Sequence, residues 1–148
     1  MSDVAEQAVR EARAWIGTPY HHQAAVKGIG TDCLGLLRGV WRAIYGEEPE
    51  AVPVYTPDWS EPQGEERLWQ AAERHLIPVQ VAQAEAGDIL LFRMRSGGVA
   101  KHLGIMSASG SAPKFIHAYS GHAVLESPLT TPWQLRVVAS FRFSEEVS

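Results

Sequence analysis

The sequence predicts an α+β fold, in which helices at the start of the chain pack on an antiparallel sheet formed by the rest. Apolar residues recur at helical spacing between residues 3 and 76, whereas short apolar runs and alternating patterns typical of strands occupy residues 86–143. Helices gathered in one part of a chain and strands in another are typical of α+β folds. A length of 148 residues is sufficient for one core, so we expect a single domain over residues 1–148.

The first helix is predicted over Asp3–Ile16. Asp3 is a suitable N-cap with Glu6 three residues later, and Gly17 with Pro19 ends the helix. One apolar stripe follows the helical period: Ala5, Ala8, Val9, Ala12 and Ile16. This helix therefore has one face suited to a core.

The second helix is predicted to begin after Thr31 or Asp32, either of which can cap it, and to end near Gly46. Cys33 then lies in its first turn, on the face that also carries Leu37, Val40, Trp41 and Ile44. An acidic, proline-rich loop over residues 47–64 and a third helix over residues 65–76 complete the helical part.

The strands follow a turn at Ala86–Asp88. An apolar run over residues 89–94 predicts a strand buried on both faces, and residues 96–100 form a glycine-rich hairpin connection. Two further strand-like segments each carry a histidine, His102 and His117. A short strand over residues 123–127 and a final strand complete the sheet; the final strand alternates through Leu135, Val137, Ala139, Phe141 and Phe143.

Cys33 is the only cysteine, which excludes an intrachain disulfide and the common multi-cysteine zinc sites. The positive end of a helix dipole and a nearby imidazolium both favour a thiolate. His102 is the candidate imidazolium, which would then protonate the leaving amine as a general acid. Singly, a lone cysteine is more often an inert buried residue and a strand histidine more often structural, but their combination points to a thiol hydrolase.

A histidine in this role needs a third group to orient its ring, and His117 is the best candidate. If the two histidine strands pair, both imidazoles lie on one side of the sheet, and we expect that side to face the Cys33 helix. Gly104 would leave room for the helix to approach. The backbone N–H of Cys33 and a second donor, Tyr20, are expected to meet the oxyanion.

No metal or cofactor is expected. The pair His21-His22 lies in an extended loop, where neighbouring side chains point apart. Gly28 and Gly30 do not form a phosphate loop, because no Gly-Lys-Ser/Thr follows and no strand precedes them.

The bulk composition excludes several classes of function. The net charge is −4 with scattered Lys and Arg, which argues against a nucleic-acid partner. No apolar run approaches the roughly 20 residues needed to span a membrane. The polar start of the chain lacks the pattern of a signal peptide, so we expect a protein made in the cytoplasm without a cleaved leader.

Four segments together resemble the NlpC/P60 family of cell-wall cysteine peptidases. They are Thr31-Asp32-Cys33-Leu34-Gly35, Ala86-Gly87-Asp88-Ile89-Leu90-Leu91-Phe92, His102-Leu103-Gly104-Ile105 and Phe115-Ile116-His117-Ala118. The resemblance covers about residues 15–143, and the order of the motifs carries its specificity. More narrowly, the chain is similar to compact members encoded among phage and gene-transfer-agent tail genes.

The resemblance implies a papain-like core and cleavage of peptidoglycan stem peptides, typically between D-glutamate, through its γ-carboxyl, and a diamino acid. It implies that Cys33 is the nucleophile, His102 the base and His117 the third polar residue. Tyr20 resembles the tyrosine beside the nucleophile, and Asp32 the aspartate that binds the amino terminus of free stem peptides. Phage or gene-transfer-agent tail proteins are the implied partners, with action at the cell wall.

Two alternatives remain open at this point. The same thiol chemistry could act on another bond, as in an amidase or acyltransferase. A different class is a catalytically silent structural protein of a phage tail, against which the set Cys33, His102 and His117 argues.

Overall fold

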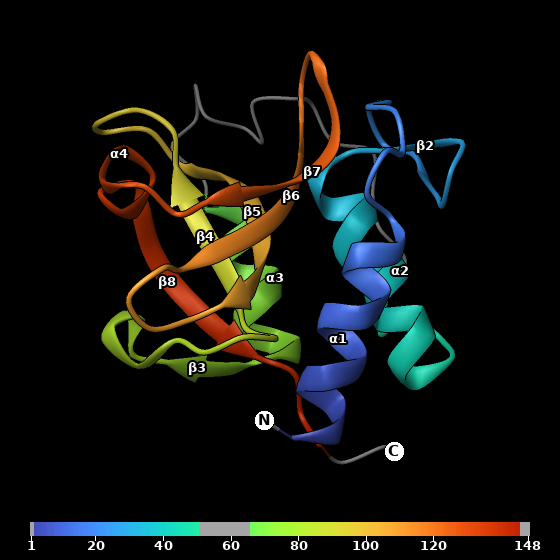
Figure 1. The fold of residues 1–148 in the computed structure, drawn as a ribbon, viewed down its shortest axis with the longest axis horizontal. Coiled ribbons are helices and arrows are strands. Elements are labelled where there is room, and N and C mark those ends of the chain that lie inside the picture. Colours follow the sequence, from blue (N-terminus) through green and yellow to red (C-terminus); the bar gives the residue numbers. More distant parts are fainter. Residues whose placement is uncertain (1, 51–65, 146–148) are drawn as a thin grey trace.

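The computed structural model describes residues 2–50 and 66–145, and its centre is a six-stranded antiparallel sheet (Figure 1). The strands follow one another across the sheet in the order β3-β8-β4-β5-β6-β7. Their bounds are β3 (Ile77–Val79), β4 (Ile89–Arg93), β5 (Ala100–Ala108), β6 (Lys114–Tyr119), β7 (His122–Pro128) and β8 (Val137–Arg142). The predicted α+β class is confirmed.

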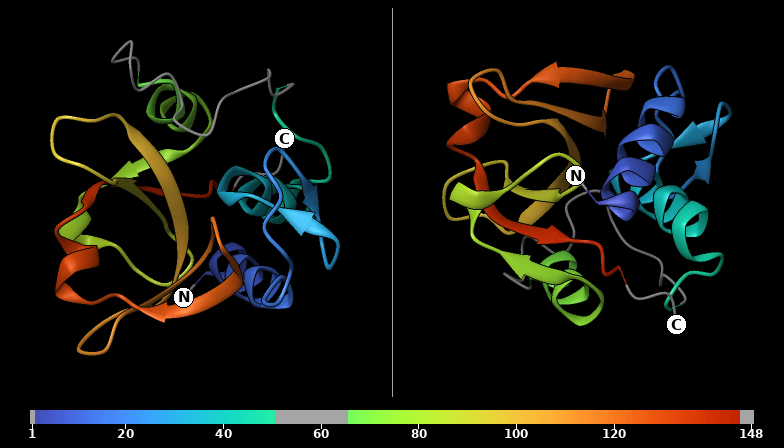
Figure 2. Two further views of the ribbon diagram at one scale, coloured as in Figure 1. Left: turned by 90° about the horizontal axis from the view of Figure 1, so that it is seen from above. Right: turned by 60° about the horizontal axis from the view of Figure 1, so that its bottom comes forward.

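Three helices cover one face of this sheet. They are α1 (Asp3–Ala14), α2 (Cys33–Tyr45) and α3 (Arg67–His75), and a small ladder of β1 (Ala25–Val26) and β2 (Gly30–Thr31) precedes α2. Figure 2 shows α1 and α2 side by side along the sheet. The core between helices and sheet contains alternate residues of the strands: Ile89, Leu91, Leu103, Ile105, Ile116 and Ala118.

The other residues of the same strands face a second core inside the curve of the sheet (Figure 2). It is covered by Trp133 from the short helix α4 (Thr131–Gln134). Its buried members are Leu90, Phe92, Met106, Phe115 and Leu129. The central strands are therefore buried on both faces, as predicted for residues 89–94.

The first helix differs in detail from the prediction. Ser2, rather than Asp3, is the N-cap, because its hydroxyl accepts the backbone N–H of Ala5 at 3.1 Å. The helix ends at Ala14, and the next side chain inward is Trp15 rather than Ile16, which is 45% exposed. Trp15 packs where Gly39 of α2 carries no side chain, since a Cβ there would lie 2.0 Å from its ring.

Five elements were not predicted: the short strands β1 and β2 before α2, β3, the 3₁₀ turn Val81–Gln83 and α4. The final strand begins at Val137, so Leu135 is not part of it and is 81% exposed. Most of the predicted loop over residues 47–64 lies outside the described residues. Among the described helices, none has the length and apolar character that crossing a membrane requires.

Candidate active site

Cys33 is the first residue of α2, and Asp32, one of the two caps that the sequence offered, is the N-cap of that helix. Asp32 has an extended backbone, and its Oδ1 accepts the backbone N–H of Gly35 at 2.8 Å. This cap fixes the start of the helix, so Cys33 lies among the N–H groups of the first turn, at the positive end of the helix dipole.

The loop before α2 is anchored to the same carboxylate. The backbone N–H of Gln23 donates to Oδ2 of Asp32 at 2.7 Å, and Gln23 has a φ of 66°, which a glutamine seldom adopts. Gly35 allows the loop to approach the helix, because a Cβ there would lie 1.9 Å from the carbonyl oxygen of Ala24. Asp32 therefore holds both the helix start and the loop.

The thiol of Cys33 is buried and points toward the sheet. Its Sγ lies 3.9 Å from the carbonyl oxygen of Lys101, the residue before His102 on β5. Burial raises the pKa of Cys33 to about 12, and the Asp32 carboxylate adds to the rise. The backbone N–H groups of Leu103, Leu34 and Cys33 act on this pKa in the opposite direction.

His102 and His117 are brought together, as predicted, by the pairing of β5 with β6. Nε2 of His102 lies 2.9 Å from Nδ1 of His117, and Nε2 of His117 lies 3.1 Å from the hydroxyl of Ser127 on β7. The other ring nitrogen of His102, Nδ1, is not used in the contact with His117. The three side chains form one hydrogen-bonded row across three adjacent strands, which we call the relay.

The relay does not lie on the side of the sheet that was expected. His102 and His117 share the face of Phe92 and Phe115, opposite the face on which α2 packs. Cys33 instead meets β5 from the start of its helix, at Lys101. Gly104 likewise leaves room for β6 rather than for the helix, since a Cβ would lie 2.8 Å from the ring of Phe115.

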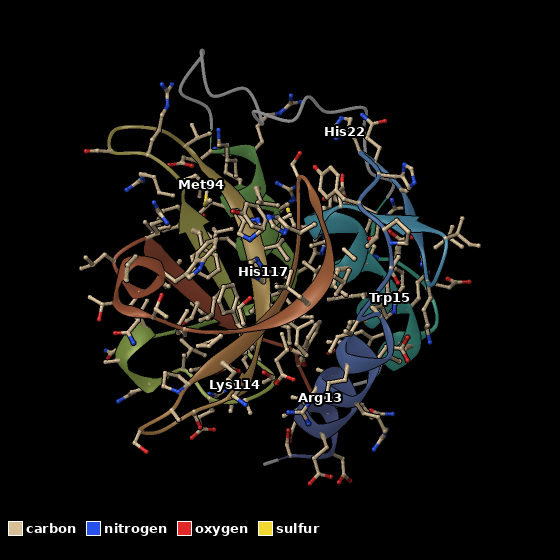
Figure 3. The ribbon with its side chains drawn as sticks, turned by 45° about the horizontal axis from the view of Figure 1, so that its top comes forward. Arg13, Trp15, His22, Met94, Lys114 and His117 are labelled. Carbon is tan, nitrogen blue, oxygen red and sulfur yellow. The ribbon has the colours of Figure 1, made fainter. Side chains whose placement is uncertain are left out.

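Aromatic rings surround the two imidazoles. His117 stacks on Phe115 and Tyr119, with ring centroids 4.1 and 5.6 Å apart, and Trp133 lies edge-on to it at 5.1 Å. Figure 3 shows His117 pointing into the curve of the sheet at the centre of the molecule. This apolar setting holds the imidazole rings in their orientation and limits their access to water.

Burial in this setting favours the neutral form of both imidazoles. It lowers the pKa of His102 to about 3, with a further decrease from His117. It lowers the pKa of His117 to about 4, with a further decrease from the nearby His122. Both shifts favour a neutral thiol and a neutral imidazole at rest, whereas the sequence led us to expect a thiolate–imidazolium pair.

Tyr20 lies beside Cys33, in the segment before α2. It forms an isolated bridge with Thr31, and its ring is partly buried against the same core as Cys33. Its pKa is raised by burial and by the charges that Cys33 and Asp32 can carry, which places the phenol near both groups. Its role as a second oxyanion donor stays a prediction.

Glu66, which the sequence did not single out, fixes the start of β5. Its Oε1 accepts the backbone N–H of Ala100 at 2.8 Å, and its Oε2 lies 3.2 Å from Nη2 of Arg93. Ala100 precedes Lys101 and His102, so this carboxylate anchors the strand segment that meets the thiol.

His21 and His22 lie in the loop before α2. Nδ1 of His22 lies 3.7 Å from Oδ2 of Asp32, and Figure 3 shows His22 at the outer edge of this loop. Within residues 2–50 and 66–145, no group of three or more His, Cys, Asp or Glu side chains is arranged to hold a metal ion.

The site combines a thiol at a helix start with a histidine pair on the strands that the thiol faces. Comparison with known families identifies the family to which a chain with this site belongs. The model of the NlpC/P60 family matches residues 17–142, a range that contains Cys33, His102 and His117. The chain belongs to the NlpC/P60 family.

Solved structures share its fold. The NlpC/P60 domain of the peptidoglycan hydrolase SagA is 24% identical, with a TM-score of 0.64 over 94% of this chain and 98% of that one. A Staphylococcus aureus protein described as similar to a lipoprotein of the NLP/P60 family is 20% identical, with a TM-score of 0.65. The alignment covers 99% of this chain and 43% of that protein, so the present chain spans less than half its length.

A Bacillus cereus NlpC/P60 family protein is 21% identical, with a TM-score of 0.66 over 94% of this chain and 40% of that one. No curated protein matches the sequence. At these identities the structural similarity concerns the fold.

Proposed function

We propose that this protein is a cysteine endopeptidase that cleaves the stem peptides of peptidoglycan. The observation that carries the proposal is the placement of the Cys33 thiol against the Lys101 carbonyl, directly before a histidine whose far nitrogen is held by His117. Membership of the NlpC/P60 family and the similarity to a peptidoglycan hydrolase domain support the substrate class.

The proposed reaction begins from the neutral pair. The Cys33 sulfur attacks the carbonyl carbon of the scissile bond while its proton passes to Nδ1 of His102. The backbone N–H of Cys33 and the hydroxyl of Tyr20 stabilise the oxyanion. The C–N bond then breaks, and the leaving nitrogen takes the proton from His102, which leaves a thioester on Cys33.

Water completes the cycle. His102 accepts a proton from the attacking water, whose oxygen forms the new carboxylic acid as the C–S bond breaks. The sulfur then recovers its proton from His102, and the free thiol is restored. His117 orients the imidazole in both halves of the reaction.

The bond we assign is the one between D-glutamate, through its γ-carboxyl, and a diamino acid, as the family resemblance implies. Asp32 is proposed to meet the ammonium of a free stem peptide, a charge-assisted contact that contributes roughly 1.5–3 kcal/mol. Its position next to the nucleophile supports this role.

Delivery to the wall is proposed to depend on a phage or gene-transfer-agent tail protein, on the basis of the narrower resemblance. Isolation of assembled tails followed by immunodetection tests this point. Recovery of the protein with the tails is expected, and its recovery only as a free protein would contradict the assignment.

Digestion of purified muropeptides, followed by mass spectrometry, tests the activity. We expect products that end in D-glutamate, together with fragments that begin with the diamino acid. Release of stem peptides with a free L-alanine from muramic acid would instead identify an amidase. The absence of any product would favour a silent structural protein.

A further inference from the structure

We propose that Ser127 is a positioning residue that accepts the last hydrogen bond of the relay when His102 carries the proton of the thiol. This inference rests on the proposed function for the identity of the reaction, but its geometry is independent of the substrate. Ser127 lies on β7, opposite Phe115 of β6, and its Oγ is 3.1 Å from Nε2 of His117.

In the resting state the hydrogen bonds of the relay can run in either direction. A serine hydroxyl donates or accepts, and each neutral imidazole has one N–H and one bare nitrogen. If Ser127 donates to His117 and His117 donates to His102, Nδ1 of His102 carries a hydrogen and cannot accept the proton of Cys33. The resting contacts alone therefore do not select the productive tautomer.

The protonated state permits one direction only. Once Nδ1 of His102 has taken the proton, Nε2 of the same ring must donate to Nδ1 of His117. His117 must then carry its hydrogen on Nε2, and the oxygen of Ser127 must accept it. Because this hydrogen bond belongs to a charged row, it is stronger in the reacting state than at rest, which is the condition for an effect on rate.

The burial of the two imidazoles makes the Ser127 hydroxyl important as an acceptor. His102 and His117 are 6% and 1% exposed, so an N–H without a partner there is costly. The titratable neighbours on the surrounding elements are Tyr119 on β6, His122 at the start of β7 and Cys33 on α2. The described structure gives Nε2 of His117 the Ser127 hydroxyl as its hydrogen-bond partner.

The test compares Ser127→Thr with Ser127→Val, two variants of nearly equal shape that differ in the hydroxyl. We expect Ser127→Thr to retain activity and Ser127→Val to lower kcat about tenfold with KM changed less than twofold. Ser140→Ala is the control, because it removes another buried hydroxyl, which bonds the carbonyl of Val79 instead. It should leave kcat unchanged.

A second readout does not depend on turnover. In protein labelled with ¹⁵N-histidine, the titration midpoint of the His102–His117 pair should fall in Ser127→Val and stay in place in Ser127→Thr and Ser140→Ala. Equal midpoints and equal kcat in the Thr and Val variants would overturn the proposal. If no stem peptide is cleaved by the wild type but the midpoint still shifts, the proposed function fails while the role of Ser127 in the relay stands.

Discussion

Nε2 of His102 lies 2.9 Å from Nδ1 of His117, a direct contact between two buried imidazoles on adjacent strands. It commits one nitrogen of His102 to its neighbour and leaves the other for proton transfer. Since burial lowers the pKa of both rings, the neutral form of the pair is favoured over the imidazolium.

Cys33→Ala should abolish hydrolysis, by at least about a thousandfold, because it removes the attacking atom. The melting temperature should change by no more than a few degrees, since the helix cap at Asp32 remains. Product release and thermal unfolding are measured on the same preparation. Activity above a few per cent in the folded variant would exclude Cys33 as the nucleophile.

The free thiol should react slowly with iodoacetamide at pH 6, and its rate should rise only at alkaline pH. The reason is that burial raises the pKa of Cys33 and lowers the pKa of His102, so that an ion pair between them is disfavoured. His102→Ala should leave this alkylation profile nearly unchanged while removing hydrolysis. A fast reaction at pH 6 that is lost in His102→Ala would restore the ion pair expected from the sequence.

His117→Gln or His117→Asn should keep measurable activity, whereas His117→Ala should lose much more. An amide oxygen can accept the hydrogen of Nε2 of His102, but a methyl group cannot. Measured values of kcat for the three variants test this prediction. The same loss in all three would show that His117 takes a direct part in proton transfer or is required for folding.

Asp32→Asn should lower the melting temperature as well as activity on free stem peptides. Both oxygens of Asp32 accept backbone N–H groups, from Gly35 and Gln23, and an asparagine has only one oxygen to offer. Leaving one buried N–H unpaired costs about 1–3 kcal/mol. An unchanged unfolding free energy would contradict this contact, and equal rates on amidated and free-amine substrates would contradict the ammonium site.

Stability should fall as the pH decreases from 7 toward 4. Unfolded histidines bind protons below about pH 6.5, whereas the pKa values of His102 and His117 are about 3 and about 4 in the fold. The unfolded state then binds more protons, so each histidine removes about 1.4 kcal/mol per pH unit within this window. Denaturant titrations should show this slope. His102→Gln should reduce the slope by the contribution of one histidine, about 1.4 kcal/mol per pH unit. A flat profile in the wild type would show that the imidazoles are not held neutral.

Much of the local structure was predictable from the sequence because local signals determine it. The cap at Asp32, the helix that starts at Cys33 and the strands around His102 and His117 each depend on residues within a few positions. The order of these elements was sufficient to predict the α+β class.

The parts that were missed depend on distant contacts. Trp133 covers the histidines from a four-residue helix, too short for a periodic signal. Ser127 joins the relay only through the register of β7 against β6. The predicted face for the histidines was wrong, because alternation reveals which residues share a side of the sheet but not which side the helices cover.

The most direct test of the central claim is acid-quench mass spectrometry of the enzyme during turnover of a defined L-Ala–γ-D-Glu–diamino acid peptide. We expect a thioester adduct on Cys33, with the mass of the amino-terminal L-Ala–γ-D-Glu fragment, that forms in the wild type and is absent from Cys33→Ala. Hydrolysis that continues in Cys33→Ala, with no adduct on the wild-type cysteine, would contradict it.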